Sequence, residues 1–122
     1  MGLDLRRTIL EREDTLRESV FVPEWDVTVE IRGMTAGDRF RLLQNTSIDG
    51  KVNFQRWFPD LVIACTFDPE TGEKVFQATD RDTLLTRSGK AIGQLAEVAS
   101  RLSGLSDADV ESAKETFQEG QS

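Results

Sequence analysis

The 122-residue sequence contains no histidine, a single cysteine, and neither a Walker phosphate loop nor a GxGxxG motif. Histidine is the commonest general base and the commonest metal ligand in proteins. Its absence therefore removes the usual Ser–His and Cys–His nucleophilic sites, and zinc clusters are excluded because they need several Cys or His residues. Without a glycine-rich phosphate loop, a nucleotide site is also disfavoured. We expect a protein that is not an enzyme and needs neither cofactor nor metal.

The single cysteine, Cys65, has no partner for an internal disulfide. A lone cysteine of this kind is typical of proteins from a reducing compartment. Its neighbours in the sequence are apolar, and no histidine is available to activate a thiolate. We interpret Cys65 as a small buried hydrophobe rather than as a reactive thiol.

Long hydrophobic runs are also missing, since no stretch approaches the roughly 18 apolar residues that a membrane-spanning helix needs. The opening segment MGLDLRRTILERED is charged throughout and contains no apolar core of a signal peptide. Gly2 is not followed by the Ser or Thr of a myristoylation site. These features predict an intracellular protein that does not associate with membranes.

The 22 Asp and Glu residues outnumber the 15 Lys and Arg residues, which gives a formal net charge of −7 and a pI of about 4.6. Nucleic-acid phosphates and anionic membrane surfaces both require Lys and Arg, so neither is an expected partner. The length fits one domain over residues 1–122, with ends at 1–4 and 118–122 that we expect to fray. The chain is therefore expected to act by binding other proteins.

Acidic residues are plentiful, but their grouping does not indicate a metal or catalytic site. The segment DPETGE contains Asp68, Glu70 and Glu73 and lacks the twelve-residue spacing of an EF-hand loop, so a hairpin turn is the better interpretation. Asp107 and Asp109 suit the N-terminus of a helix. Composition leaves a hydrolase with paired carboxylates as the enzymatic alternative.

Alternating apolar and polar residues predict strands in the first third of the chain. Trp25, Val27, Val29 and Ile31 are separated by polar residues, as in a strand with one buried face. Residues 20–22 and 27–31 are expected to pair as a hairpin around the turn at Pro23. The segment FDPETGEKVF predicts a second hairpin, with 65–67 and 74–76 as its arms.

Helical spacing predicts the other elements. We expect short helices at 5–14 and at 35–45, the second capped by Thr35 with Asp38 three residues later. Residues 53–64 fit a helix that gives way to a strand near Ala64, or a buried strand, because Pro59 limits a continuous helix; we favour the helix.

The last part of the chain predicts two helices, separated by a stop at Ser103 and Gly104 and a new cap at Ser106. The apolar stripe of the first consists of Ala91, Ile92, Leu95, Val98, Ala99 and Leu102. Because strands come first and helices last, the predicted class is α+β, with small N-terminal antiparallel β-hairpins packed against a C-terminal helical part.

Two groups of apolar residues are candidates for binding a partner protein. Trp57 and Phe58 lie beside Pro59 and are either core residues or exposed anchors. The apolar faces of the last two helices either form the core or offer a strip for helix-in-groove packing. The candidate partner-binding residues are Trp57, Phe58, Ile92, Leu95, Leu102, Val110 and Phe117.

Two segments resemble the tail assembly chaperones of long-tailed phages (siphoviruses) and prophages. They are VPEWDVTVEIRGMTAGDRF and LVIACTFDPETGEKVFQATDRDTLLTRSGKAIGQLAEVASRLSGLSDADVESAKETF. In that family a strand with VPEW is followed by a short helix, and a hairpin then leads into a helix that ends in RLSGL. The resemblance covers about residues 19–117. The chain departs from the pattern at Pro59 and around Met34.

The resemblance implies a protein that binds the tape measure protein, keeps it soluble and promotes assembly of the tail tube. It further implies self-association, possible contact with the major tail protein and with a longer, frameshifted form of the same chain, and no cofactor. The expected location is the host bacterial cytoplasm, with absence from the mature virion. The alternative is a structural minor tail or connector protein that remains in the virion.

Overall fold

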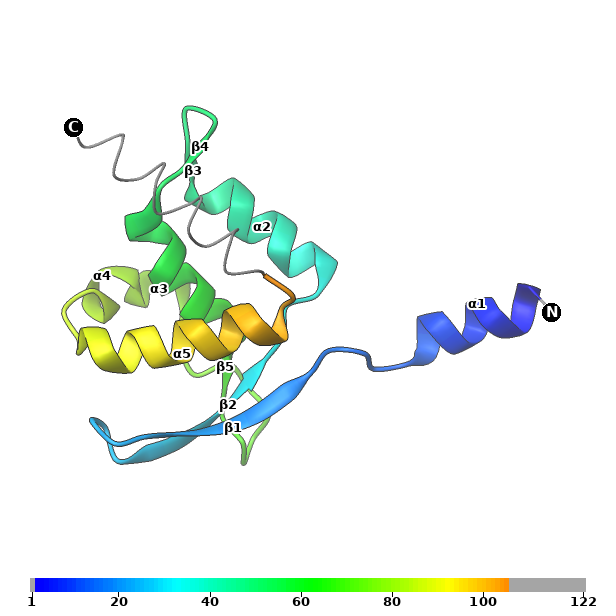
Figure 1. Cartoon of the computed structure of the whole chain (residues 1–122), viewed down its shortest axis with the longest axis horizontal. Helices are drawn as coiled ribbons and strands as arrows, with labels where there is room; N and C mark the ends of the chain where they lie inside the picture. The colour runs from blue at the N-terminus through cyan, green and yellow to red at the C-terminus, as the bar shows by residue number, and fades with distance from the viewer. Residues whose placement is uncertain (1, 106–122) are drawn as a thin grey trace.

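The computed structural model describes residues 2–105 and forms a helix-covered sheet from which one helix projects (Figure 1). The predicted helix that begins at Ser106 lies outside the described residues. In chain order the elements are α1 (Gly2–Glu11), β1 (Arg17–Val22), β2 (Val27–Arg32), α2 (Ala36–Thr46), β3 (Ser47–Ile48), β4 (Lys51–Val52), α3 (Phe54–Cys65), β5 (Thr66–Phe67), the 3-10 turn η1 (Ala78–Asp80), α4 (Arg81–Leu84) and α5 (Gly89–Leu102).

The predicted first hairpin is confirmed, and it forms two strands of a three-stranded antiparallel sheet in the order β1-β2-β5. Val20 pairs with Val29, and both side chains are buried on the inner face. The buried face of β2 is shorter than the alternation predicts. Trp25 lies in the turn, where its N–H donates to the Val22 carbonyl (3.2 Å), and Val27 at the tip remains 42% exposed.

The predicted cap of α2 is present, since the Thr35 hydroxyl accepts from the N–H of Asp38 (3.1 Å). A small hairpin, β3–β4, follows this helix at a place where no element was predicted. Its turn residues Asp49 (φ 54°) and Gly50 (φ 77°) are both left-handed, as a tight two-residue hairpin turn requires. The Asp-Gly pair was the sequence signal for this turn.

Residues 54–67 confirm a helix followed by a strand, and the alternative of a buried strand through Leu61 is wrong. The Asn53 side chain caps α3 by accepting from the N–H of Arg56 (3.2 Å). Pro59 lies inside the helix and costs it one hydrogen bond. The helix continues because Pro59 is fully buried among apolar neighbours, which tertiary packing holds in place.

The second predicted hairpin is confirmed at its turn but not along its full length. The N–H of Gly72 donates to the Asp68 carbonyl (2.8 Å), and Gly72 has a φ of 75°. Only one bridge, Phe67 to Lys74, links the two arms outside the named strands. β5 also pairs with β2, so that Phe67 has a partner on both sides, and beyond Lys74 the second arm is irregular and leads into η1.

The apolar stripe of α5 is confirmed as core, because Ala91, Leu95 and Ala99 are completely buried. α5 lies across the sheet and packs against α3, while α2 packs on the other side of α3 (Figure 1). The helix ends in a Schellman motif: the N–H of Leu105 donates to the Ser100 carbonyl (2.9 Å), and Gly104 has a φ of 74°. The observed class is the predicted α+β.

Candidate protein-binding surfaces

The structure places the predicted binding strip mainly in the core. Trp57, Ile92 and Leu95 are buried, and Phe58 and Leu102 are half-buried against the same cluster. These side chains pack between α3, α5 and the sheet, so they are not exposed anchors, and the core interpretation holds for them. Val110 and Phe117 lie outside the described residues. Two surfaces are formed by other, exposed apolar side chains on α1 and α2, and a third is a hollow whose apolar lining is buried or half-buried.

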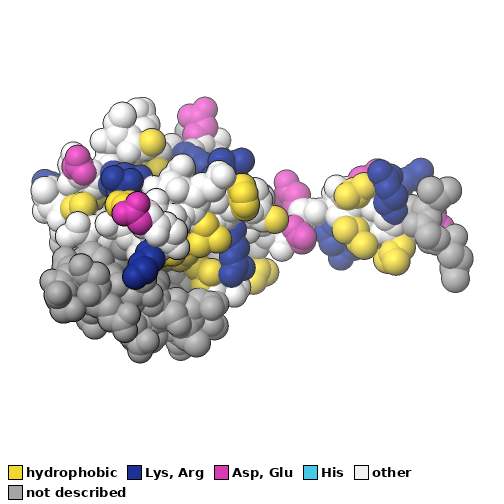
Figure 2. Space-filling model, turned by 90° about the horizontal axis from the view of Figure 1, so that it is seen from above, with side chains coloured by type: hydrophobic (Ala, Val, Ile, Leu, Met, Phe, Trp, Pro, Cys, Tyr) yellow, Lys and Arg dark blue, Asp and Glu magenta, His cyan; other side chains and the backbone are white. Residues whose placement is uncertain are grey.

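The first surface is an apolar stripe on α1, formed by Leu5, Ile9 and Leu10. Each of the three side chains is more than 60% exposed, and together with Arg6 they border a shallow hollow on the helix. Figure 2 shows these hydrophobic side chains gathered on the projecting helix beside Lys and Arg side chains. Within residues 2–105, no hydrogen bond or ion pair joins α1 to the body of the molecule.

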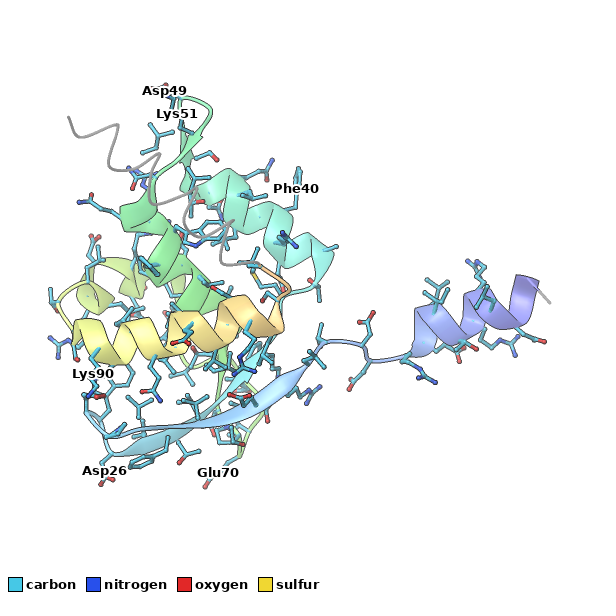
Figure 3. The ribbon with its side chains drawn as sticks, in the orientation of Figure 1. Asp26, Phe40, Asp49, Lys51, Glu70 and Lys90 are labelled. Atoms are coloured by element: carbon cyan, nitrogen blue, oxygen red, sulfur yellow. The ribbon has the colours of Figure 1, made fainter. Side chains whose placement is uncertain are left out.

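The second surface is the outer face of α2, formed by Phe40 and Leu43 and called the α2 face below. Phe40 is 62% exposed and points away from the body in Figure 3. The opposite side of the helix is anchored in the core by Leu42. Burial opposes ionisation of Asp38, but hydrogen bonds from Arg41 and Thr35 outweigh this effect and lower the pKa of Asp38. Asp38 therefore keeps its negative charge in the first turn of α2, where it stabilises the helix that presents the α2 face.

The third surface is an apolar hollow of about 390 Å³ at the tip of the β1–β2 hairpin, called the tip hollow below. Its lining residues are Trp25, Phe76, Asp80, Thr83, Leu84 and Arg87. Four segments build it: the hairpin turn supplies Trp25, the irregular arm supplies Phe76, and η1–α4 supplies Asp80, Thr83 and Leu84. The turn after α4 supplies Arg87. A concave apolar site with a few polar groups at its rim is suited to receive apolar side chains of a partner.

A salt bridge holds α4, and with it one wall of the tip hollow, against α3. The Arg81 guanidinium donates two hydrogen bonds to the Asp60 carboxylate, the one from Nε at 2.7 Å. This paired geometry raises the pKa of Arg81. Both groups also border a polar groove of about 170 Å³ between α2, α3 and Lys74. Asp38 and Asp60 in that groove are already paired with arginines, so we interpret it as structural.

The described residues contain no feature that indicates bond-making chemistry. Across residues 2–105, no three Asp, Glu or Cys side chains are close enough together to hold a metal ion. Cys65 is buried as predicted, and burial raises the pKa of its thiol to about 12. In the same part of the chain, none of the helices combines the length and the apolar character needed to cross a membrane.

Comparison with known proteins finds similarity among solved structures. No protein-family model matches the sequence, and no curated protein matches it. Among solved structures, the tail assembly chaperone of bacteriophage HK97 is similar, with a TM-score of 0.56 and 20% sequence identity. The match covers 84% of this chain and 95% of that chain. The chain has the fold of a phage tail assembly chaperone.

This tail assembly chaperone fold is the one that the sequence resemblance implied, and Pro59 and Met34 are accommodated within it. The exposed surfaces were not predicted from the sequence, because the exposure of a side chain depends on which face of its helix or strand packs against the core. Phe40 and Leu43 have the spacing of a core stripe, yet α3 covers Leu42 instead. Charged neighbours were the signal in the sequence that this face is exposed. Arg39 and Arg41 flank Phe40, as expected on a solvated face of a helix.

Proposed function

We propose that this chain is a phage tail assembly chaperone that binds the tape measure protein, keeps it soluble and promotes assembly of the tail tube. The observation that supports the proposal is the likeness of its fold to the HK97 tail assembly chaperone over most of both chains. The ordered motifs around VPEW and RLSGL add a second, independent line of support. In this proposal the chain has no catalytic role, works in the host cytoplasm and is absent from the finished virion.

The α2 face is the surface that we assign to the client. A long helical client with an apolar stripe aggregates through that stripe unless the stripe is covered. Phe40 and Leu43 lie three residues apart on one helix, so their side chains form a continuous apolar ridge that can pack against a client helix. The net charge of −7 keeps such a complex soluble.

Co-expression with the tape measure gene of the same genome tests the proposal. We expect the tape measure protein to become soluble and to co-purify with this chain. The double variant Phe40→Ser and Leu43→Ser should lower the recovered amount at least several-fold. Phe21→Ser is the matched control, because Phe21 is 52% exposed on the opposite, outer face of the sheet. A tape measure protein that stays insoluble and unbound would contradict the assignment.

Mass spectrometry of purified virions separates the chaperone from a structural tail component. A chaperone is released during assembly, so its peptides should be missing from virions and present in the lysate of infected cells. Peptides present in virions at a stoichiometry similar to that of a minor tail protein would favour the structural alternative.

A further inference from the structure

The α2 face is the largest part of a stripe that runs along the exposed side of its helix. Ala36 lies four residues before Phe40, so Ala36, Phe40 and Leu43 fall within about 60° of one another around the helix axis. The β3–β4 hairpin adds Ile48, which is 41% exposed, at the end of the helix. The helix is roughly 16 Å long, so the stripe matches about three turns of a client helix.

The flank of this stripe carries positive charge. Arg39 is exposed and lies one helical turn before Leu43, so it borders the stripe. Among residues 2–105, no carboxylate forms an ion pair with Arg39. Asp38, the one acidic residue in the sequence of α2, is half-buried and already paired with Arg41. A client side chain beside the stripe therefore meets an arginine without a carboxylate partner.

The segment around α2 has the same sign of charge. Residues 36–56 comprise α2, the β3–β4 hairpin and the first turn of α3, and they contain four basic and two acidic residues. Their net charge is +2, which leaves −9 on the remainder of the chain, because the whole chain has −7. Figure 3 shows Phe40, Asp49 and Lys51 at one end of the molecule and Asp26 at the opposite end. The α2 face thus lies at the positive end of an acidic protein.

This polarity distinguishes between two kinds of client segment. A helix with basic residues beside its apolar stripe would be attracted to the negative remainder of the chain and repelled by Arg39. A helix with acidic residues beside its stripe would be repelled by the remainder and attracted at the α2 face. Charge therefore directs only the acidic kind of helix to the exposed apolar stripe.

We infer that the α2 face recognises a helical segment of the tape measure protein whose apolar stripe is flanked by Asp and Glu. The apolar side chains of this segment pack against Phe40 and Leu43, and its carboxylates lie against Arg39 and toward Lys51. Apolar burial supplies most of the affinity, and the charges select the segment. The inference rests on the proposed function and adds to it the chemistry of the segment that is bound.

Charge reversal in the full chain tests the inference by co-expression with the tape measure gene. The variant Arg39→Glu with Lys51→Glu keeps the apolar stripe and should lower the recovered tape measure protein at least several-fold. The loss should be large in about 0.05 M sodium chloride and small in about 0.5 M, because salt screens exposed charges. Arg12→Glu with Lys90→Glu is the matched control, because both residues are exposed, lie outside the three surfaces and give the same change in net charge. Circular dichroism checks that each variant is folded.

The outcomes of this experiment separate the inference from the proposed function. Recovery that the reversal leaves unchanged, or that falls equally in both salt concentrations or in the control, would overturn the inference while the chaperone assignment stands. A tape measure protein that the unchanged chain leaves insoluble and unbound would contradict the assignment itself, and the inference with it.

Photo-cross-linking identifies the bound segment directly. A photoreactive phenylalanine analogue in place of Phe40 should attach to the tape measure protein, and mass spectrometry then locates the attached segment. We expect apolar residues at spacings of three and four, with more Asp and Glu than Lys and Arg between them. Replacing two of those acidic residues by Lys should weaken binding to the unchanged chain and restore binding to the variant Arg39→Glu with Lys51→Glu.

Four results of the cross-linking experiment would overturn the inference. They are attachment to a segment of net positive charge, attachment only within the same chain or to a second copy, no attachment in a complex that does form, and a charge exchange that restores no binding.

Discussion

Gly33 marks the point where the end of β2 meets the end of α5. A Cβ at this position would lie 2.4 Å from the Leu102 carbonyl oxygen. The next residue strengthens the junction, since the N–H of Met34 donates to the Ser103 hydroxyl (2.9 Å). Because the obstacle is backbone, it cannot move aside as a flexible side chain would. We expect Gly33→Ala to lower the free energy of unfolding by about 1–3 kcal/mol, measured by urea denaturation.

Gly93 provides the comparison for that substitution. It is an exposed helical glycine in α5 with no atom within 4 Å of a built Cβ. Gly93→Ala should therefore raise the free energy of unfolding by roughly 0.5–1 kcal/mol, through helix propensity alone. Equal effects at both positions would show that the close approach at Leu102 has no energetic consequence.

Cys65 should make stability depend on pH in the alkaline range. Burial raises the pKa of its thiol to about 12, whereas an unfolded thiol titrates near 8.5. The unfolded chain therefore loses its proton first, and the free energy of unfolding falls above about pH 8.5, by up to roughly 1.4 kcal/mol per pH unit, until the folded thiol ionises. The chain has neither His nor Tyr to obscure this range.

Urea denaturation at pH 7.5 and at pH 9.5 measures the effect of Cys65. Cys65→Ala should show a smaller difference between the two pH values than the unchanged chain, although it is less stable at both. Iodoacetamide at pH 8.5 should label the thiol only after the chain is unfolded in urea. Rapid labelling of the folded chain would mean that Cys65 is accessible.

At the scale of elements, the Asp60–Arg81 pair attaches α4 to α3. The carboxylate of Asp60 is 13% exposed, so removing it leaves a guanidinium that is partly buried without its partner. Asp60→Ala should lower the free energy of unfolding by about 1.5–3 kcal/mol in a thermal or urea melt. Glu18→Ala breaks the pair with Arg101, which is exposed, and should have a much smaller effect. Similar losses in both variants would mean that burial does not determine the strength of these pairs.

The elements that the sequence predicted well are those with a local physical cause. Thr35 caps α2, and Gly104 ends α5, because each role depends on a few neighbouring backbone groups. The second arm of the 68–76 hairpin was overpredicted. Its turn residues formed the expected turn and Phe67 pairs with Lys74, but no strand extends beyond that bridge, and β5 gains its other partner, Glu30, from β2. Pairing of this kind depends on distant residues, which periodicity cannot reveal.

At the scale of the whole molecule, sequence periodicity identified the core but not the surfaces. The stripe of α5 was correctly recognised as apolar, and a domain of this size needs nearly all of it for its own core. The tip hollow combines Trp25, Phe76 and Leu84 from three separate elements, so it exists only after folding. The candidate binding residues that lie within residues 2–105, which were chosen from apolar spacing alone, therefore fell on the interior.

Deletion of residues 2–12 tests whether α1 contributes to the stability of the body. Because no hydrogen bond or ion pair joins α1 to the body within residues 2–105, the shortened chain should unfold at the same temperature as the full chain in a thermal melt. A large loss of stability in the shortened chain would mean that α1 packs on its own body.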